Sequence, residues 1–434
     1  MIRVTPLILA VALFMENMDS TVIATSLATI AADIGSEPIA LKLALTAYLV
    51  SLAIFIPVSG WMADRFGARK VFQWAMLVFV LGSILCAVSD SLLAFVASRF
   101  IQGMGGAMMS PLARLVLVRS TPRSRLVDVM AWLTIPALIG PIIGPPFGGF
   151  LTTYFSWHWI FLINVPIGFA GIWLAGAYLP PMEPRPVKPI DRVGFILAGI
   201  AFSGVVFGIS VVSLPALPPV FGVGAIAAGI VSGTAYVFHA RRSPHPLLDL
   251  RVLRFPLFRT SVIAGSFFRL GVGATPFLLP LLLQLIFGLT PFESGMVTFT
   301  GATGAMAAKF VARWSFLTFG FRTLLVSTSF VSALLITVTG FYTPATPLWL
   351  IMGLLIAAGF AHSTFFTGSM AFSFADIEEK DEGQANVITA VSGQITFALG
   401  VALGGGILEA SHLLRGGDLV LADFQTAFFG VGTV

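Results

Sequence analysis

Hydrophobic residues run along this chain in blocks too long for the helices of an ordinary soluble core. A helix that crosses a bilayer needs roughly twenty mostly apolar residues, and in lipid its backbone must hydrogen-bond to itself. The segments that meet or approach this length begin near Thr5, Leu41, Val71, Ser91, Val127, His158, Arg192, Val220, Arg259, Pro291, Arg322, Thr346, Glu382 and Asp423. The pattern therefore predicts an all-α polytopic membrane protein with fourteen spanning segments.

Both ends of the chain affect this count. Arg3 and the apolar run after it resemble a signal peptide, but Glu16 and Asp19 interrupt the run. We therefore expect this segment to stay in the protein as the first spanning helix. The last segment has only about a dozen residues before Val434, so we expect the printed chain to stop inside its final helix.

Composition and charge support a membrane location and suggest its orientation. Only 10% of the residues are charged and 57% are hydrophobic, with a mean hydropathy of +0.98, whereas soluble proteins carry roughly a quarter charged residues. If the N-terminus is cytoplasmic, 18 of the 24 Lys and Arg fall in cytoplasmic loops, while Lys42 and Arg415 lie outside. This asymmetry predicts a cytoplasmic N-terminus in the inner (plasma) membrane. It also accounts for the basic balance without a nucleic acid partner.

The chain contains an internal repeat. Phe66, Gly67 and Arg69 match Phe319, Gly320 and Arg322 at an offset of 253 residues, and "GPPFGGFL" from Gly144 resembles "GVALGGGIL" from Gly400 at an offset of 256. Duplicated bundles that rock about a central site are a transporter architecture. We predict two six-helix bundles, residues 1–182 and 258–434, with two inserted helices and their cytoplasmic linkers in residues 183–257 and the last helix incomplete.

Five motifs carry a resemblance to a known family. "GWMADRFGARKVF", "RFIQGMGGAMM" and "GPIIGPPFGGF" resemble signature motifs of the major facilitator superfamily, while "MDSTVIATSLATI" and "WHWIFLINVPIG" resemble its fourteen-helix drug:proton antiporter branch. The resemblance covers essentially the whole chain and implies export by alternating access, driven by proton entry. The sequence departs from the family pattern at two places. In the second-half loop motif, Leu317 and Thr318 stand where the first half has Asp64 and Arg65, and Glu16 is not a general feature of the branch.

Two of these motifs predict moving parts. In the first loop motif, the charged side chains can pair with helix ends of the neighbouring bundle, and small residues allow close approach and a tight turn. We interpret this motif as a conformational latch, formed by Gly60, Asp64, Arg65, Gly67 and Arg69. In the fifth span, prolines kink the helix and glycines four apart allow close packing. This antiporter motif comprises Gly140, Pro141, Gly144, Pro145, Gly148 and Gly149.

The first span contains Glu16 and Asp19, which together oppose membrane insertion by about 5–7 kcal/mol. Their spacing places them on one face of a helix, so we expect both to face a central cavity and at least one to bind protons. Asp19 lies on the family's first-span motif and is the preferred coupling residue, with Glu16 as a second acid or a contact for a cationic drug. The resemblance assigns a role in proton transfer to Arg99. A purely structural pairing of the two acids with a buried Arg is the alternative.

Further charged and aromatic residues lie within the spans. Arg269 and Lys309 can counter the acids or bind anionic substrate groups, while Lys309 and Arg114 can also snorkel to the membrane surface. His362 is either a packing residue or a proton relay. Trp132 and Phe268 are candidates for stacking on flat cationic drugs.

These features predict a secondary transporter rather than an enzyme. The expected function is proton-coupled export of hydrophobic, cationic compounds. Alternatives are a dedicated exporter of one metabolite or anion and, in another class, a polytopic enzyme or sensor. The sequence has no metal-ligand cluster or phosphate-binding loop, so we expect no metal and no cofactor other than the proton. The expected partners are small-molecule substrates and the lipid bilayer, around a monomer.

Overall fold

The computed structural model describes residues 4–121, 125–212, 214 and 218–433, and within them the chain is helical. The helices of the first half are α1 (Val4–Val22), α2 (Leu27–Asp33), α3 (Lys42–Phe66), α4 (Ala68–Ala87), α5 (Leu92–Ser120), α6 (Leu126–Tyr154), α7 (Trp159–Leu162) and α8 (Asn164–Tyr178). An inserted pair follows, α9 (Arg192–Val212) and α10 (Pro219–Arg242). The helices of the second half are α11 (Pro256–Leu281), α12 (Pro291–Phe319), α13 (Phe321–Thr339), α14 (Leu348–Ser373), α15 (Glu382–Arg415) and α16 (Leu421–Gly432).

All fourteen segments predicted from the sequence are helical, the sixth being divided into α7 and α8, and the short α2 lies between the first two segments. Among the described residues, eleven helical segments are long and apolar enough to cross a membrane. The other three predicted segments are α6 and α12, each of 29 residues, and α16, of 12 residues. The prediction of an all-α polytopic fold is confirmed.

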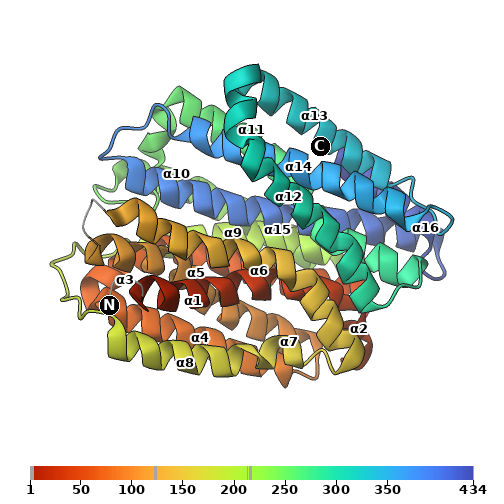
Figure 1. The fold of residues 1–434 in the computed structure, drawn as a ribbon, viewed down its shortest axis with the longest axis horizontal. Helices are drawn as coiled ribbons and strands as arrows, with labels where there is room; N and C mark the ends of the chain where they lie inside the picture. Colours follow the sequence, from red (N-terminus) through yellow and green to blue (C-terminus); the bar gives the residue numbers. More distant parts are fainter. Residues whose placement is uncertain (1–3, 122–124, 213, 215–217, 434) are drawn as a thin grey trace.

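Most helices run roughly along the long axis of the molecule, and the two halves lie side by side across that axis, the first half below and the second half above in Figure 1. Within the first half, α1 packs on α6 and α5 packs between α3 and α4; within the second half, α11 packs on α15 and α12 on α14. The halves meet through two helix pairs, α6 with α12 and α3 with α15. The inserted pair packs against both partners of the second interface, because α9 contacts α3 and α15.

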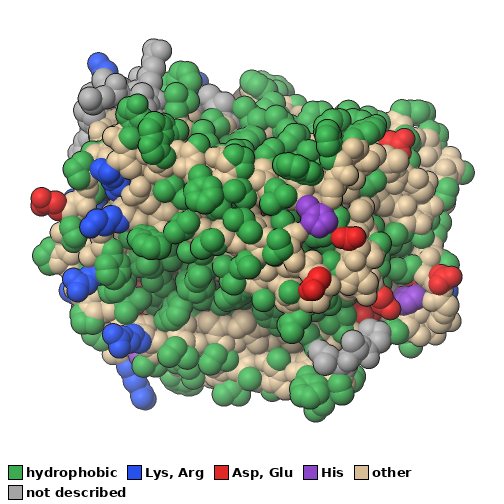
Figure 2. All heavy atoms as spheres, turned by 90° about the horizontal axis from the view of Figure 1, so that it is seen from below, with side chains coloured by type: hydrophobic (Ala, Val, Ile, Leu, Met, Phe, Trp, Pro, Cys, Tyr) green, Lys and Arg blue, Asp and Glu red, His purple; other side chains and the backbone are tan. Residues whose placement is uncertain are grey.

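On one face of the molecule, the charged side chains separate by sign. On the face in Figure 2, Lys and Arg gather at the left end, where the chain begins in Figure 1, and most Asp and Glu lie at the right end. The band between them is largely hydrophobic. Such a belt between two polar ends is the surface that a bilayer requires.

Direct polar contacts between the halves gather at the end of the molecule away from the N-terminus, which we call the closed end. There Gln284 Nε2 donates to the Thr25 carbonyl at 2.9 Å, and Phe292 N–H donates to Thr153 Oγ1 at 3.0 Å. A salt bridge between Lys42 and Glu409 lies at the same end. These contacts connect segments more than 100 residues apart in the sequence.

Candidate functional site: a buried charge network in the first half

Asp19 lies in the interior of the first half and is fully buried. Its Oδ2 forms a salt bridge of 2.8 Å with Nη1 of Arg99 from α5. Its Oδ1 accepts hydrogen bonds from Gln102 Nε2 at 2.8 Å and from Asn164 Nδ2 of α8 at 2.9 Å. Three donors from two other helices therefore hold this carboxylate, which is the condition under which a buried charge is tolerated.

A second layer of contacts fixes these donors. Ser83 of α4 accepts hydrogen bonds from Gln102 at 2.8 Å and from Asn164 at 3.3 Å. The guanidinium carbon of Arg99 lies 4.3 Å from the centre of the Tyr48 ring, a cation–π contact with α3. The network thus joins α1, α3, α4, α5 and α8 around one charge pair, and moving any one of these helices would disturb it.

Glu16 lies one turn earlier on α1, in a different environment. Its side chain is half-buried, and among the described residues its Oε2 is a buried atom with no hydrogen-bond partner. Arg114 and Asp19 are the charged groups that act on it electrostatically. A buried carboxylate oxygen without a donor is costly while ionised. Glu16 is therefore the acid of the pair that has a buried oxygen without a donor among the described residues.

The expectation that both acids face a central cavity is wrong for Asp19. The side chain of Asp19 points to α5 and α8 inside the first half. The physical reason is that residues three apart on a helix are separated by about 60° around its axis. This rotation is enough to place Asp19 in the helix contact while Glu16 keeps some exposed surface.

The other charged residues predicted from the sequence lie apart from this network. The guanidinium of Arg269 lies 5.5 Å from the centre of the Phe366 ring, and Lys309 Nζ donates to Thr367 Oγ1 at 2.8 Å on the exposed side of α12. Arg114 is exposed on α5. Neither Arg269 nor Lys309 forms a cross-half ion pair with an acid of α1 among the described residues, and the cation paired with Asp19 is Arg99 of the same half.

His362 and the two candidate aromatic residues have separate surroundings. His362 packs edge-on against Phe268, with ring centres 5.9 Å apart, and its Nε2 is buried without a hydrogen-bond partner among the described residues. Phe268 stacks on Phe365 at 3.7 Å and lines a cavity of about 210 Å³ within the second half. Trp132 is 48% exposed. The roles predicted for these residues remain predictions.

A second buried ion pair, missed in the sequence, joins the two halves. Lys42 begins α3 and Glu409 lies near the end of α15, and the two side chains form a salt bridge with almost no exposed surface. We expected Lys42 in an outside loop, but the structure places it inside the helix contact at the closed end. The signal was present, because Glu409 is an acid within an apolar segment and such residues have the same membrane cost as Glu16 and Asp19.

The loop motif forms its contacts inside the first half. Asp64 Oδ1 pairs with Arg119 of α5 at 2.7 Å, and Arg69 donates to the carbonyl oxygens of Leu179, at 3.1 Å, and Gly176 near the end of α8. Gly67 has a φ of +91°, and a Cβ there would lie 2.7 Å from the Met182 carbonyl oxygen, so only glycine fits this turn. The expected pairing with the neighbouring bundle is not formed in this conformation.

Two other latch residues differ from the simplest expectation. No atom of the described residues lies within 4 Å of a Cβ built at Gly60, so this glycine does not provide a close helix contact here. It is exposed on α3, as is Arg65, whose guanidinium lies 5.9 Å from the Phe66 ring centre. Both therefore have space for a further contact in another conformation.

The antiporter motif forms two contacts from one helix. Added Cβ atoms at Gly140, Gly144 and Gly148 would meet α1 between Phe14 and Val22, so this four-residue spacing allows the close packing of α1 on α6. A Cβ at Gly149 would overlap the Pro291 carbonyl of α12. Pro141 and Pro145 lie inside the helix, and the Pro145 carbonyl faces Gly295 across the interface between the halves.

The repeat seen in the sequence reappears as equivalent packing. Gly404 of α15 approaches Ala274 of α11, as Gly148 of α6 approaches α1. Gly405 approaches Lys42 of the first half, as Gly149 approaches the second half. Gly320 also repeats the positive φ of Gly67, at +76°. Corresponding residues therefore form both the contact within each half and the contact between halves.

Among the described residues, no group of three or more His, Cys, Asp or Glu side chains could hold a metal ion. The network contains instead paired ions, amides and hydroxyls within membrane-spanning helices. Two bundles with equivalent helix packing and a buried charge network define a polytopic membrane protein of the transporter class.

Comparisons with known proteins agree. The family described as Major Facilitator Superfamily matches residues 9–244. A Pectobacterium atrosepticum protein, provisionally named multidrug resistance protein MdtD, is 33% identical over 409 residues, covering 94% of this chain and 88% of the relative. A Yersinia enterocolitica protein of the same name is 34% identical over 411 residues, covering 94% and 87%. The chain belongs to the major facilitator superfamily, and it is a multi-pass membrane transporter rather than an enzyme.

Solved structures show the same fold at low sequence identity. The in meso crystal structure of the POT family transporter PepTSo has a TM-score of 0.72 and 14% identity, and the match covers 100% of this chain and 96% of that one. A crystal structure of a peptide transporter POT in complex with sulfate has a TM-score of 0.71 and 14% identity, covering 99% and 93%. The TM-scores establish the shared fold, whereas sequence identities this low carry no information on the substrate of this chain.

Proposed function

We propose that the protein is a proton-coupled antiporter that exports hydrophobic, cationic compounds across the inner membrane by alternating access. The observation that carries this proposal is the pair of acids on α1 in unequal environments, Asp19 with three donors and Glu16 with a buried oxygen that has none. The curated relatives named for multidrug resistance support the substrate class.

The proposed coupling follows from this difference. In the conformation described, the Asp19 carboxyl group is paired with Arg99, and we assign the exchanged proton to Glu16, whose buried Oε2 has no donor among the described residues. A proton that reaches Asp19 removes its attraction for Arg99 and loosens the contact of α1 with α5 and α8. A cationic substrate that approaches Glu16 favours its ionised form and so favours proton release. Proton and cation then compete for Glu16, which is the requirement for exchange, and protonation of Asp19 accompanies the change of conformation.

The position of the closed end supports the orientation that we propose. The basic end of the molecule would face the cytoplasm by the positive-inside rule. The closed end, with Lys42 and Glu409, would then face outward, and the conformation described would be the inward-facing one. Gly60 and Arg65, which are exposed at the basic end, would contact the second half in the outward-facing conformation.

Transport by reconstituted protein tests the proposal. In proteoliposomes with an imposed pH gradient, we expect the wild type to move a lipophilic cation such as ethidium against its gradient. We expect Asp19→Asn to abolish gradient-driven transport. Exchange of one proton for one monovalent cation moves no net charge, so the pH gradient is the driving force, and each pH unit corresponds to about 1.4 kcal/mol, or about tenfold in concentration ratio.

The control is exchange without a pH gradient, which reports whether the variant still binds and carries the cation. Gradient-driven transport that survives Asp19→Asn would show that this residue is not the coupling group. Transport of anions alone, lost in Arg269→Gln, would favour the alternative of an anion exporter.

A further inference from the structure

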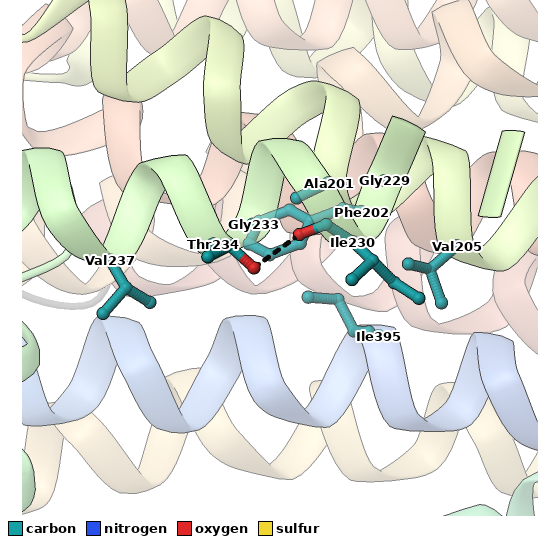
Figure 3. A pocket seen from close by; sticks show the side chains of 9 residues that line it. All are labelled: Ala201, Phe202, Val205, Gly229, Ile230, Gly233, Thr234, Val237 and Ile395. Carbon is teal, nitrogen blue, oxygen red and sulfur yellow. Dashed lines mark hydrogen bonds between the residues drawn. The ribbon is translucent and has the colours of Figure 1, made fainter. Parts of the chain in front are cut away.

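The inserted pair and α15 form a groove on the lipid-facing surface that the transport mechanism does not use. It has a volume of about 420 Å³ and lies between α9, α10 and Ile395 of α15 (Figure 3). The volume falls within the range of about 300–1,000 Å³ found for small-molecule sites. Gly229 and Gly233 of α10 contribute no side chains, and this leaves the groove open.

The lining is chemically apolar. Thr234 supplies the hydroxyl among the lining residues, and its Oγ1 donates to the carbonyl of Ile230 in the same helix at 2.8 Å (Figure 3). The hydroxyl is therefore already satisfied and offers no strong site to a polar ligand. Because α9 and α10 are membrane-spanning segments, the molecules beside this groove are lipids, and a hydrocarbon chain matches its lining.

One end of the groove leads to a positive charge. Ile230, Thr234 and Val237 follow one face of α10, and the helical repeat places Arg241 on the same face, one turn after Val237. Arg241 is exposed in the last turn of α10. In the part of the chain that the structure describes, no carboxylate forms an ion pair with it. Arg242 is rotated by about 100° from this face.

We propose that this groove binds one anionic phospholipid of the surrounding bilayer, with an acyl chain between α10 and α15 and its phosphate at Arg241. Basic side chains at the membrane surface attract anionic headgroups, and the groove supplies the hydrophobic contact that a surface charge alone lacks. Since α9 also contacts α3, the bound lipid would hold the inserted pair against the α3–α15 interface. The proposal does not depend on the identity of the transported compound.

Native mass spectrometry of the full-length purified protein, with phosphatidylglycerol or phosphatidylcholine added, tests this site. We expect the wild type to retain one phosphatidylglycerol under conditions that remove phosphatidylcholine. Arg241→Ala should lower the retained fraction about fivefold. Arg242→Ala, which removes the same charge from the same turn but off the groove face, should leave retention unchanged.

A second pair of variants tests the acyl-chain contact without altering charge. A Cβ at Gly233 would lie 3.5 Å from Ala201 Cβ, an ordinary contact, so Gly233→Leu can fold while filling the groove. Gly224, with no described atom within 4 Å of such a Cβ, provides the control Gly224→Leu. We expect the first to lose phosphatidylglycerol and the second to keep it. Wild-type retention in Arg241→Ala or Gly233→Leu, or equal losses in Arg241→Ala and Arg242→Ala, would overturn the proposal.

Discussion

At the scale of single residues, neighbouring acids acquire different properties from the donors around them. Asp19 and Glu16 lie on the same helix, yet three donors reach the first and none reaches one buried oxygen of the second. The sequence alone did not show which donors surround Asp19, because Gln102 and Asn164 come from distant segments of the chain. Both lie within recognised motifs, "RFIQG" and "INVPIG", and a search for amides in those motifs would have found them.

Asp191, in the linker before α9, gives a pH-dependent prediction outside the membrane. Burial raises the pKa of this carboxyl, but hydrogen bonds from Gly194 N–H, His239 Nε2 and Leu247 N–H outweigh burial and lower the pKa below its ordinary value of 3.8. The ionised form is thus favoured by folding. Its contribution to stability is complete above pH 3.8 and is lost as the pH falls through the lowered pKa.

We expect Asp191→Asn to lower the melting temperature at pH 7, with a difference from wild type that shrinks as the pH falls below 4. Thermal unfolding in detergent between pH 3 and pH 7 measures this. Glu183→Gln, at an exposed acid of the same linker, is the control and should match the wild type throughout. A difference for Asp191→Asn that is constant over this pH range would contradict the assigned ionisation.

At the scale of elements, the helix contacts within each half and between the halves depend on glycines that the repeat places at equivalent positions. The sequence predicted the repeat from two short matches. Gly148 and Gly404 are equivalent positions that each form a contact within their own half, and Gly149 and Gly405 are equivalent positions that each contact the other half. The sequence could not show which of the possible contacts between charged side chains are formed in the conformation described here. In the conformation described, Asp64 pairs with Arg119 and Arg69 donates to the Leu179 carbonyl, both within the first half. Lys42 and Glu409 instead form a salt bridge between the halves.

The Lys42–Glu409 pair gives a prediction about the α3–α15 contact. Removing one partner of a buried ion pair costs about 3–5 kcal/mol, whereas replacing both by apolar groups is often neutral. We expect Glu409→Gln to open the closed end, since opening returns Lys42 to water. Thr25 is fully buried at this end, so a cysteine there, in a Cys86→Ser background, reports the opening by labelling with an impermeant maleimide.

In Glu409→Gln, labelling of Thr25→Cys should accelerate at least tenfold, which corresponds to a decrease of about 1.4 kcal/mol in the free energy of opening the closed end. In the double variant Lys42→Met/Glu409→Leu it should return toward the parent rate. Labelling at the parent rate in Glu409→Gln would show that the ion pair does not hold the closed end together.

At the scale of the whole molecule, the fold was predictable because the bilayer imposes strong constraints. Long apolar blocks predict spanning helices, charge asymmetry between loops predicts their orientation, and an internal repeat predicts duplicated bundles. The fourteen predicted segments coincide with helices. Lys42 shows the limit of this reasoning. A charge near the end of an apolar segment is assigned to a loop by composition, and only the position of Glu409 in the folded chain reveals that it is buried.

The most direct test of the account is whether substrate binding releases a proton from Glu16, the acid of α1 to which we assign it. Purified protein in weakly buffered detergent solution is mixed with tetraphenylphosphonium or ethidium, and the pH is followed. We predict acidification by the wild type and none by the double variant Glu16→Gln/Asp19→Asn, with binding of the cation measured separately. Proton release by the double variant equal to that of the wild type would contradict the account.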